Sequence, residues 1–382
     1  MVKTKSLKGA FLAGLLVVIS FWAGFSLNSY WQEKNSSSNS HRPSPPSPTP
    51  LPLLAYSLPA LKATPTTADT ITLEKVITTG QTSLSVLFSY QVMGKKISGL
   101  ANFPTTAPAW GGILMLRGWA PVQNYHSGTG TKNAGLFLAQ NGLLTFAPDF
   151  LGYGQSDPPP ADVLQARFEK PLQVKQLLTN LQQGKIVCHS EVVGSELPLL
   201  EQICSQNKLP TLPWGMWAHS NGGQIALSTL EITQDAYPTT LWAPVSVGFP
   251  YSVLFFTDEE ADEGKNSRAF IAQFESKYNS DDFSHSRHLD WLPPGLKLQL
   301  HHGSGDEAAL ISWSNEFEQK ITQENAHRAQ AAQIELTYYR YPGANHNLQP
   351  HWQQVVERDI DFFRQHSPTR SEERRVGKEC RS

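Results

Sequence analysis

Cysteine is scarce in this chain, with three residues in 382. So few cysteines exclude a scaffold built on disulfides, and none of them shows the C-x-x-C spacing of a zinc site. We therefore expect no metal and no other cofactor.

Charge is also sparse, since only 17% of the residues are charged and the formal net charge is −2. A domain that binds nucleic acid is expected to be basic, so we expect no nucleic-acid partner. The sequence has no internal repeat, which argues against a solenoid or propeller. At 40% hydrophobic residues, the chain can bury one large core.

The sequence has one long hydrophobic run, the uncharged residues 10–27, preceded by Lys3, Lys5 and Lys8. As a helix, this run would span on the order of 27 Å, close to the thickness of a bilayer core. The lysines favour a cytoplasmic N-terminus. We favour an uncleaved signal anchor within residues 1–30, with a cleaved signal peptide as the alternative. In both cases the body of the protein is exported, and an anchor makes it a single-pass protein of the cell membrane.

Residues 31–66 contain a serine-rich stretch followed by closely spaced prolines. This composition is typical of an extended tether, so we expect the ordered domain to begin near Thr70 and to span residues 67–369. Residues 370–382 are mostly charged and have no apolar period. They resemble the translation of a sequencing adapter, so we expect this tail to be non-native, with a genuine disordered basic tail as the alternative.

Between these ends, short apolar strands alternate with amphipathic helices, which predicts an α/β fold with a mostly parallel sheet and helices on both faces. Two longer segments interrupt the alternation, an insert at residues 182–212 and an excursion at residues 248–294. Strands are expected at residues 84–92, 97–103, 112–116, 143–147, 214–218, 240–245, 296–300 and 334–339, and helices at residues 131–140, 161–181, 224–230, 267–278, 312–328 and about 352–363.

The stretch from Pro213 to Leu230 reads as a buried strand, a sharp turn at Ser220 and a helix. Small residues two positions before and after the serine, Ala218 and Gly222, let the strand and the helix pass closely. This stretch resembles the G-x-S-x-G nucleophile elbow of the α/β-hydrolase fold, with Ala218 in place of the first glycine. The resemblance implies that Ser220 is a nucleophile.

In this fold the acid and the base follow the nucleophile in chain order. The resemblance places the acid at Asp306, in the H-G-x-x-D pattern after the strand at residues 296–300, with Glu307 as the nearest rival. It places the base at His346, in the loop after the last strand, with His351 as the competitor.

The fold also needs two backbone N–H groups for an oxyanion. The resemblance implies that Asn221, at the start of the helix after the elbow, supplies one of them. We expect the other from Trp119 in the loop after the strand at residues 112–116, although Arg117 stands where the family usually has histidine. A D-x-x-G-x-G-x-S motif at residues 149–156 is interpreted as structural.

Within the fold, the chain most resembles the prolyl-oligopeptidase and dienelactone-hydrolase group. This resemblance implies a serine hydrolase that cleaves a small-molecule ester or a peptide. The alternative is a non-catalytic, membrane-tethered binding domain of the same fold.

The excursion at residues 248–294 lies where the family has its cap, between the sixth and seventh strands of its sheet. Its aromatic residues suggest an acyl pocket and its carboxylates a site for a cationic group. The alternative, which we favour, is a core-packed helix beside a solvated acidic turn.

Cys188 and Cys204 both lie in the insert at residues 182–212 of an exported protein. We expect them to form a disulfide that closes a loop of about 17 residues.

Overall fold

Strands in the middle of the chain are apolar along their whole length, as expected for a sheet that is covered on both faces. In the computed structural model, which describes residues 51–106, 108–193, 198–257 and 261–366, they belong to one ten-stranded sheet. The strands are β1 (Ile71–Thr79), β2 (Ser83–Val92), β3 (Lys95–Pro104), β4 (Gly111–Leu116), β5 (Leu143–Pro148), β6 (Ile186–Cys188), β7 (Trp214–His219), β8 (Thr239–Trp242), β9 (Lys297–Gly303) and β10 (Glu335–Tyr341).

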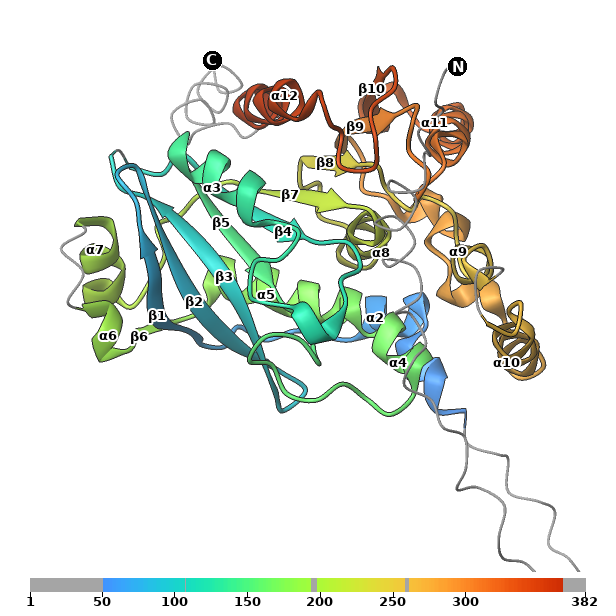
Figure 1. The fold of residues 1–382 in the computed structure, drawn as a ribbon, viewed down its shortest axis with the longest axis horizontal. Helices are drawn as coiled ribbons and strands as arrows, with labels where there is room; N and C mark the ends of the chain where they lie inside the picture. Colours follow the sequence, from blue (N-terminus) through green and yellow to red (C-terminus); the bar gives the residue numbers. More distant parts are fainter. Residues whose placement is uncertain (1–50, 107, 194–197, 258–260, 367–382) are drawn as a thin grey trace, which may run out of the picture.

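The strand order is β10-β9-β8-β7-β4-β5-β3-β2-β1-β6 (Figure 1). All pairs from β5 across to β10 are parallel. The hairpins of β1, β2 and β3 add an antiparallel part, joined to β5. The predicted mostly parallel sheet is therefore confirmed, and the carboxyl ends of β4, β7, β9 and β10 meet at one edge.

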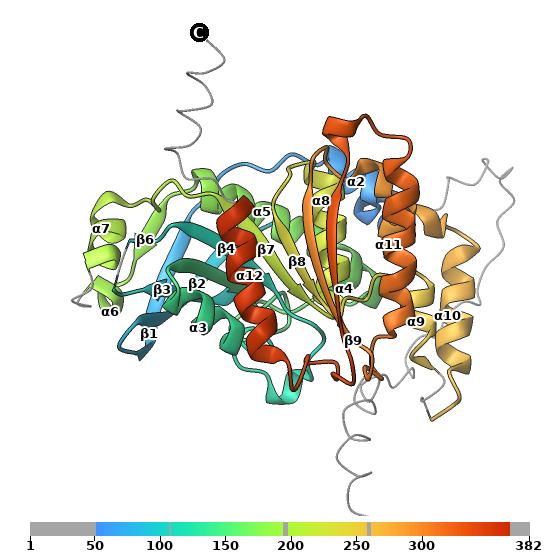
Figure 2. The same cartoon turned by 90° about the horizontal axis from the view of Figure 1, so that it is seen from above.

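Helices cover both faces of this sheet. Along β4, Ile113 and Met115 pack with α3 and α12, whereas Leu114 and Leu116 pack with α5, α8 and α11 on the other face. Figure 2 shows α3 and α12 side by side across the strands. The helices are α2 (Leu58–Ala63), α3 (Lys132–Gln140), α4 (Val163–Phe168), α5 (Lys170–Gln183), α6 (Ser190–Val193), α7 (Pro198–Gln206), α8 (Asn221–Thr233), α9 (Tyr251–Leu254), α10 (Lys265–Glu275), α11 (Ile311–Asn325) and α12 (Trp352–His366).

The prediction of an extended tether over residues 31–66 is wrong for the last part of that range. Residues Pro52–Tyr56 form a 3₁₀-helix and Leu58–Ala63 form α2, which packs on α8. Leu58 and Leu61 are buried in the main core and Leu53 in a smaller one. The ordered domain thus begins before Thr70, because these apolar side chains have a surface on which to pack.

The helix expected at residues 161–181 is divided into α4 and α5. Pro171 lies in the first turn of α5, where backbone N–H groups have no intrahelical acceptor and the missing N–H of proline costs nothing. For the same reason proline cannot donate the next hydrogen bond of α4, so α4 ends before it. This break places Arg167 at the end of one helix and Lys170 at the start of the next.

The insert at residues 182–212 forms β6, α6 and α7, and β6 pairs with β1 at the end of the sheet. Cys188 and Cys204 form a disulfide with their Cα atoms 5.6 Å apart, so the predicted pairing is confirmed. In the chain-entropy model, closing a loop of this length stabilises the fold by about 3 kcal/mol.

The excursion at residues 248–294 lies between β8 and β9. Its described part contains α9, α10 and the short 3₁₀-helices Ser280–Phe283, His285–Arg287 and Leu289–Trp291. In Figure 1, α9 and α10 lie at the end of the molecule opposite α6 and α7. Among the described residues, no helix is long and apolar enough to cross a membrane. The predicted anchor at residues 1–30 and the tail at residues 370–382 lie outside the described residues.

Candidate active site

Ser220 lies between β7 and α8 with a positive φ of 56° and a ψ of −124°. A non-glycine residue adopts such a conformation only when its surroundings impose it. Here the Ser220 N–H donates to the Trp242 carbonyl, and the Ser220 carbonyl accepts from Val245. The end of β8 thus holds the elbow in its strained form.

The two small positions around Ser220 behave as the sequence predicts. A Cβ on Gly222 would lie 2.0 Å from the Leu116 carbonyl oxygen, so only glycine lets α8 pass this close to β4. Ala218 is fully buried, and the methyl group that departs from the family pattern is accommodated.

Asp306 and His346 meet at the carboxyl ends of β9 and β10. The Nδ1 atom of His346 lies 2.8 Å from Oδ2 of Asp306, and the His346 side chain is 22% exposed. The other carboxylate oxygen, Oδ1, accepts the backbone N–H groups of Ala308 and Ala309 at 2.9 Å. Glu307, the rival acid, is exposed.

His302 is a second histidine on Asp306, and its role was not predicted from the sequence. Its Nε2 lies 3.1 Å from Oδ2 of Asp306 and 2.9 Å from the Ala309 carbonyl oxygen, and both partners are acceptors. Nε2 therefore carries a proton, and Nδ1 can accept from the Ser314 hydroxyl at 2.7 Å. The signal available in the sequence for this role was the pair of adjacent histidines, His301 and His302, directly before Gly303.

Asp306 is 7% exposed. Burial raises its pKa, but the hydrogen bonds from His302 and His346 outweigh this effect and hold the pKa well below its usual range. The carboxylate is therefore ionised at neutral pH and its two oxygens have separate functions. One is fixed by backbone N–H groups and the other faces two histidines.

His219, directly before Ser220, holds the loop that carries His346. Its Nε2 lies 2.9 Å from the His346 carbonyl oxygen, and the two imidazole rings are 4.7 Å apart. Removal from water, with a further contribution from His346, lowers the pKa of His219 to about 4. At neutral pH, His219 is uncharged and donates from Nε2.

The loop after β4 lies against the elbow. A Cβ on Gly118 would be 2.8 Å from Cβ of Ser220 and 3.2 Å from its Oγ. Arg117, the departure from the family pattern, donates to the Gly118 and Asp149 carbonyl oxygens. Its guanidinium group also stacks 4.0 Å above the ring of Tyr153. The side chain of Arg117 thus fixes the loop that presents Trp119.

Asp149 begins the D-x-x-G-x-G-x-S motif and is completely buried. Its carboxylate accepts the hydroxyl groups of Ser98, Tyr125 and Ser127. A Cβ on Gly154 would lie 2.2 Å from Oδ2 of Asp149, so glycine is required there. These contacts support the structural interpretation of the motif.

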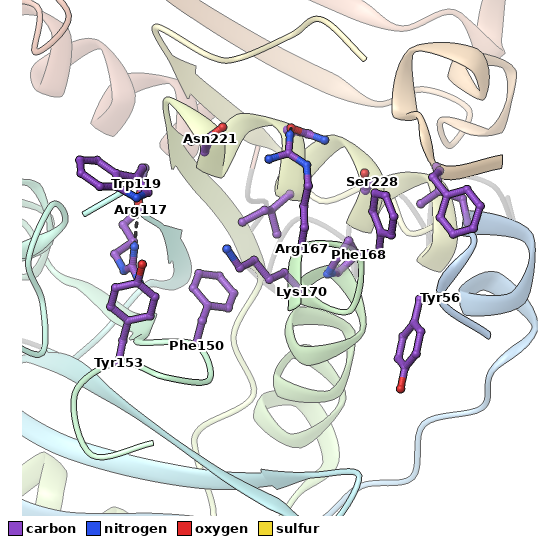
Figure 3. A pocket seen from close by; sticks show the side chains of 16 residues that line it. Tyr56, Arg117, Trp119, Phe150, Tyr153, Arg167, Phe168, Lys170, Asn221 and Ser228 are labelled. Atoms are coloured by element: carbon purple, nitrogen blue, oxygen red, sulfur yellow. Dashed lines mark hydrogen bonds between the residues drawn. The ribbon is translucent and has the colours of Figure 1, made fainter. Parts of the chain in front are cut away.

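A cavity of about 80 Å³ adjoins the elbow. Trp119 and Asn221, the two expected oxyanion donors, lie in its wall, together with Tyr56 and Leu58 from the segment expected to be a tether (Figure 3). The remaining lining residues are Arg117, Gly118, Phe150, Tyr153, Arg167, Phe168, Lys170, Pro171, Gln224, Ile225, Ser228 and Phe283.

Three of the described residues in this wall are cationic, and two of them, Arg167 and Lys170, were not predicted from the sequence to belong to a site. Figure 3 shows their side chains extending into the cavity, with Arg117 across from Lys170. Burial lowers the pKa of Arg167 to about 10. Burial, followed by the charges of Arg117 and Arg167, lowers the pKa of Lys170 to about 7.

The described part of the excursion at residues 248–294 contributes one side chain to this cavity, Phe283. Phe274 and Tyr278 pack in a small core with Phe249, whereas Phe255 and Phe256 pack against Trp313. The carboxylate of Asp262 accepts the backbone N–H groups of Gly264 and Asn266 at the start of α10. The favoured interpretation, core packing beside an acidic turn, agrees with these contacts.

No protein-family model and no curated protein matches the sequence. Solved structures do match. Acetyl xylan esterase 1 from Thermoanaerobacterium sp. JW/SL YS485 is 14% identical, with a TM-score of 0.50 over 81% of this chain and 93% of the esterase. A puromycin-hydrolyzing peptidase of Mycobacterium tuberculosis is 12% identical, with a TM-score of 0.51 over 75% of this chain and 40% of the peptidase. With the sheet order and the elbow, these likenesses establish that the chain has the α/β-hydrolase fold.

Proposed function

We propose that this protein is a serine hydrolase that cleaves an ester or an amide through an acyl-enzyme on Ser220. The observation that carries the proposal is the strained elbow serine beside the loop of a histidine whose Nδ1 lies 2.8 Å from a buried carboxylate. A serine hydroxyl needs a base, and the base needs an orienting group. His346 and Asp306 have the chemistry for these two roles.

In the proposed reaction, the Oγ atom of Ser220 forms a bond to the substrate carbonyl carbon while Nε2 of His346 takes the hydroxyl proton. The C–O or C–N bond to the leaving group then breaks, and His346 returns the proton to the leaving group. Water repeats both steps to release the acid and restore Ser220. Asp306 keeps the proton of the neutral imidazole on Nδ1, which leaves Nε2 free as a base.

The developing oxyanion would lie between the backbone N–H groups of Trp119 and Asn221. As the first residue of α8, Asn221 has an N–H that no intrahelical carbonyl can accept, and the helix dipole favours negative charge there. The solved structures similar to this chain include an esterase and a peptidase, which supports both leaving groups as candidates. We also propose that residues 248–294 act as a cap, since Phe283 closes part of the cavity.

A fluorophosphonate probe tests the function directly, because it reacts only with a serine that a base activates. We expect it to label wild-type protein and Ser276→Ala protein, and to leave Ser220→Ala protein unlabelled. Ser276 is a suitable control because it is exposed and does not line the cavity beside the elbow. An unlabelled wild type would instead favour the non-catalytic binding domain.

We further propose that the protein is exported and held at the membrane by residues 1–30, because of the apolar run at residues 10–27 and its lysine flank. Expressed with this segment, the protein should sediment with membranes and resist extraction at high pH. Cleavage within residues 35–52 should release the domain. A mature N-terminus near residues 28–32 would show a cleaved signal peptide instead.

A further inference from the structure

The cavity beside the elbow combines three cations with no carboxylate among the described residues that line it. Positive groups that are gathered in a partly dry cavity repel one another and lose hydration. Such an arrangement is unfavourable unless a negative group enters the cavity or each cation has partners of its own. The partners of the three cations therefore decide what the cavity can bind.

Arg117 has partners of its own. It donates to two carbonyl oxygens from its two terminal nitrogens and stacks on Tyr153, although its buried Nε has no hydrogen-bond partner among the described residues. Arg167 is only partly satisfied. Its Nη2 donates to Gln224 Oε1 at 2.6 Å and to Ser252 Oγ at 2.9 Å, whereas its buried Nε has no hydrogen-bond partner among the described residues.

Lys170 is the least satisfied of the three. Its Nζ lies 5.7 Å from the centre of the Phe150 ring and the charge of Glu169 acts on it, but it has no hydrogen bond to any described residue. The neighbouring Glu169 accepts from Gln165 and Gln173 and does not line the cavity. An ammonium group with three donors thus extends into a cavity where no group of the described residues accepts them.

The position of the cavity indicates which part of a substrate would reach it. Trp119 and Asn221 lie in its wall, but neither His346 nor any described residue of the loop after β10 does. His346 must reach the leaving group to protonate it. The leaving group therefore lies on the side of His346, and the acyl part extends toward Lys170.

We propose that the cavity receives a terminal carboxylate carried on the acyl part of the substrate, held by Lys170 and Arg167. This inference rests on the proposed function, since it names the substrate class of the same site. The substrates are then half-esters or half-amides of dicarboxylic acids. A cavity of about 80 Å³ holds a carboxylate and a short part of its chain, since a single water needs roughly 10–15 Å³.

The test compares 4-nitrophenyl half-esters of glutaric, adipic and pimelic acids with their neutral methyl esters, after subtraction of spontaneous hydrolysis. For the best chain length, the wild type should have a kcat/KM at least about 10-fold higher for the acid than for the methyl ester. Lys170→Met should lower kcat/KM about 10- to 100-fold for the acid, the range expected for a charge-assisted hydrogen bond, and change the methyl ester about twofold at most.

Two variants serve as controls. Lys170→Arg keeps the charge and should retain a preference for the acid. Lys132→Met removes an exposed lysine of α3 that does not line this cavity, and both substrates should react as with the wild type.

The pH dependence of the preference is a second readout. Lys170 faces Arg117 from the loop after β4, Arg167 from α4 and Glu169 from the residue before α5. Because its pKa is lowered to about 7, the free enzyme loses this charge as the pH rises through 7. The ratio of the two kcat/KM values should fall over this range in the wild type and stay flat in Lys170→Arg, since any pH effect that is common to both substrates cancels in the ratio.

The outcomes separate this inference from the proposed function. If the probe labels Ser220 and neutral esters are cleaved without any preference for the acids, the carboxylate site is wrong and the hydrolase stands. If no ester is cleaved, the proposed hydrolase function is wrong, and calorimetry with adipate then tests whether the cavity binds a carboxylate. Binding to the wild type that Lys170→Met abolishes would support the anion site, and no binding to the wild type would overturn it.

Discussion

Replacing Ser220 with alanine should lower kcat on any cleaved ester by a factor on the order of 10⁴–10⁶, and His346→Ala should do the same. The two residues act in one proton transfer, so either change removes the whole step. The double variant should therefore be no more than a few-fold slower than either single variant. Single-turnover kinetics on a 4-nitrophenyl ester would measure these rates.

His351→Ala is the matched control for His346→Ala. His351 also follows β10, but its ring packs beside Tyr341, with 5.5 Å between the ring centres, and it does not contact Asp306. We expect kcat within about threefold of the wild type. If the loss of kcat in the Ser220 and His346 double variant equals the product of the two single losses, the two residues act in separate steps. The proposed mechanism would then be wrong.

The sequence predicted the strand–turn–helix at Ser220 and the pairing of Asp306 with His346, because each of these residues lies in a local pattern. The strand at residues 214–218 and the small residues around Ser220 are contiguous in the sequence. The positions of the acid and the base follow from the order of the strands that precede them. The structure places Asp306 beside His346 and places Trp119 and Asn221 in one cavity wall.

The cationic cavity could not be predicted in the same way. Lys170 and Arg167 lie on a segment that reads as one amphipathic helix, and only the break before Pro171 gives them their positions. Their neighbours Arg117 and Tyr56 come from segments that are far away in the sequence. Polar side chains without a period or a motif give no signal until the fold brings them together.

The N-terminal boundary was wrong for a different reason. Proline-rich composition indicates a tether when no surface is available for packing, and the sequence does not reveal that surface. Leu58 and Leu61 are three residues apart on one face of α2, and that face packs on α8. A short apolar helix next to a proline-rich stretch should thus be weighed as part of the domain.

Asp306→Asn should lower kcat by a factor on the order of 10⁴, and the structure explains why an isosteric change would be so costly. The Oδ1 position accepts two backbone N–H groups, so the asparagine must keep its oxygen there. Its NH₂ group then faces Nδ1 of His346 and Nε2 of His302. A donor that faces Nδ1 forces the proton of neutral His346 onto Nε2. A protonated Nε2 can no longer accept the proton of Ser220.

Glu307→Gln is the control, because Glu307 is adjacent in the sequence and exposed. It should leave kcat unchanged within about twofold, with both variants compared on the same ester. The melting temperature of each variant should be recorded, since the NH₂ group that Asp306→Asn introduces would also oppose the donor of His302. A large loss in Glu307→Gln and a small loss in Asp306→Asn would transfer the role of the acid to Glu307 and contradict the geometry around His346.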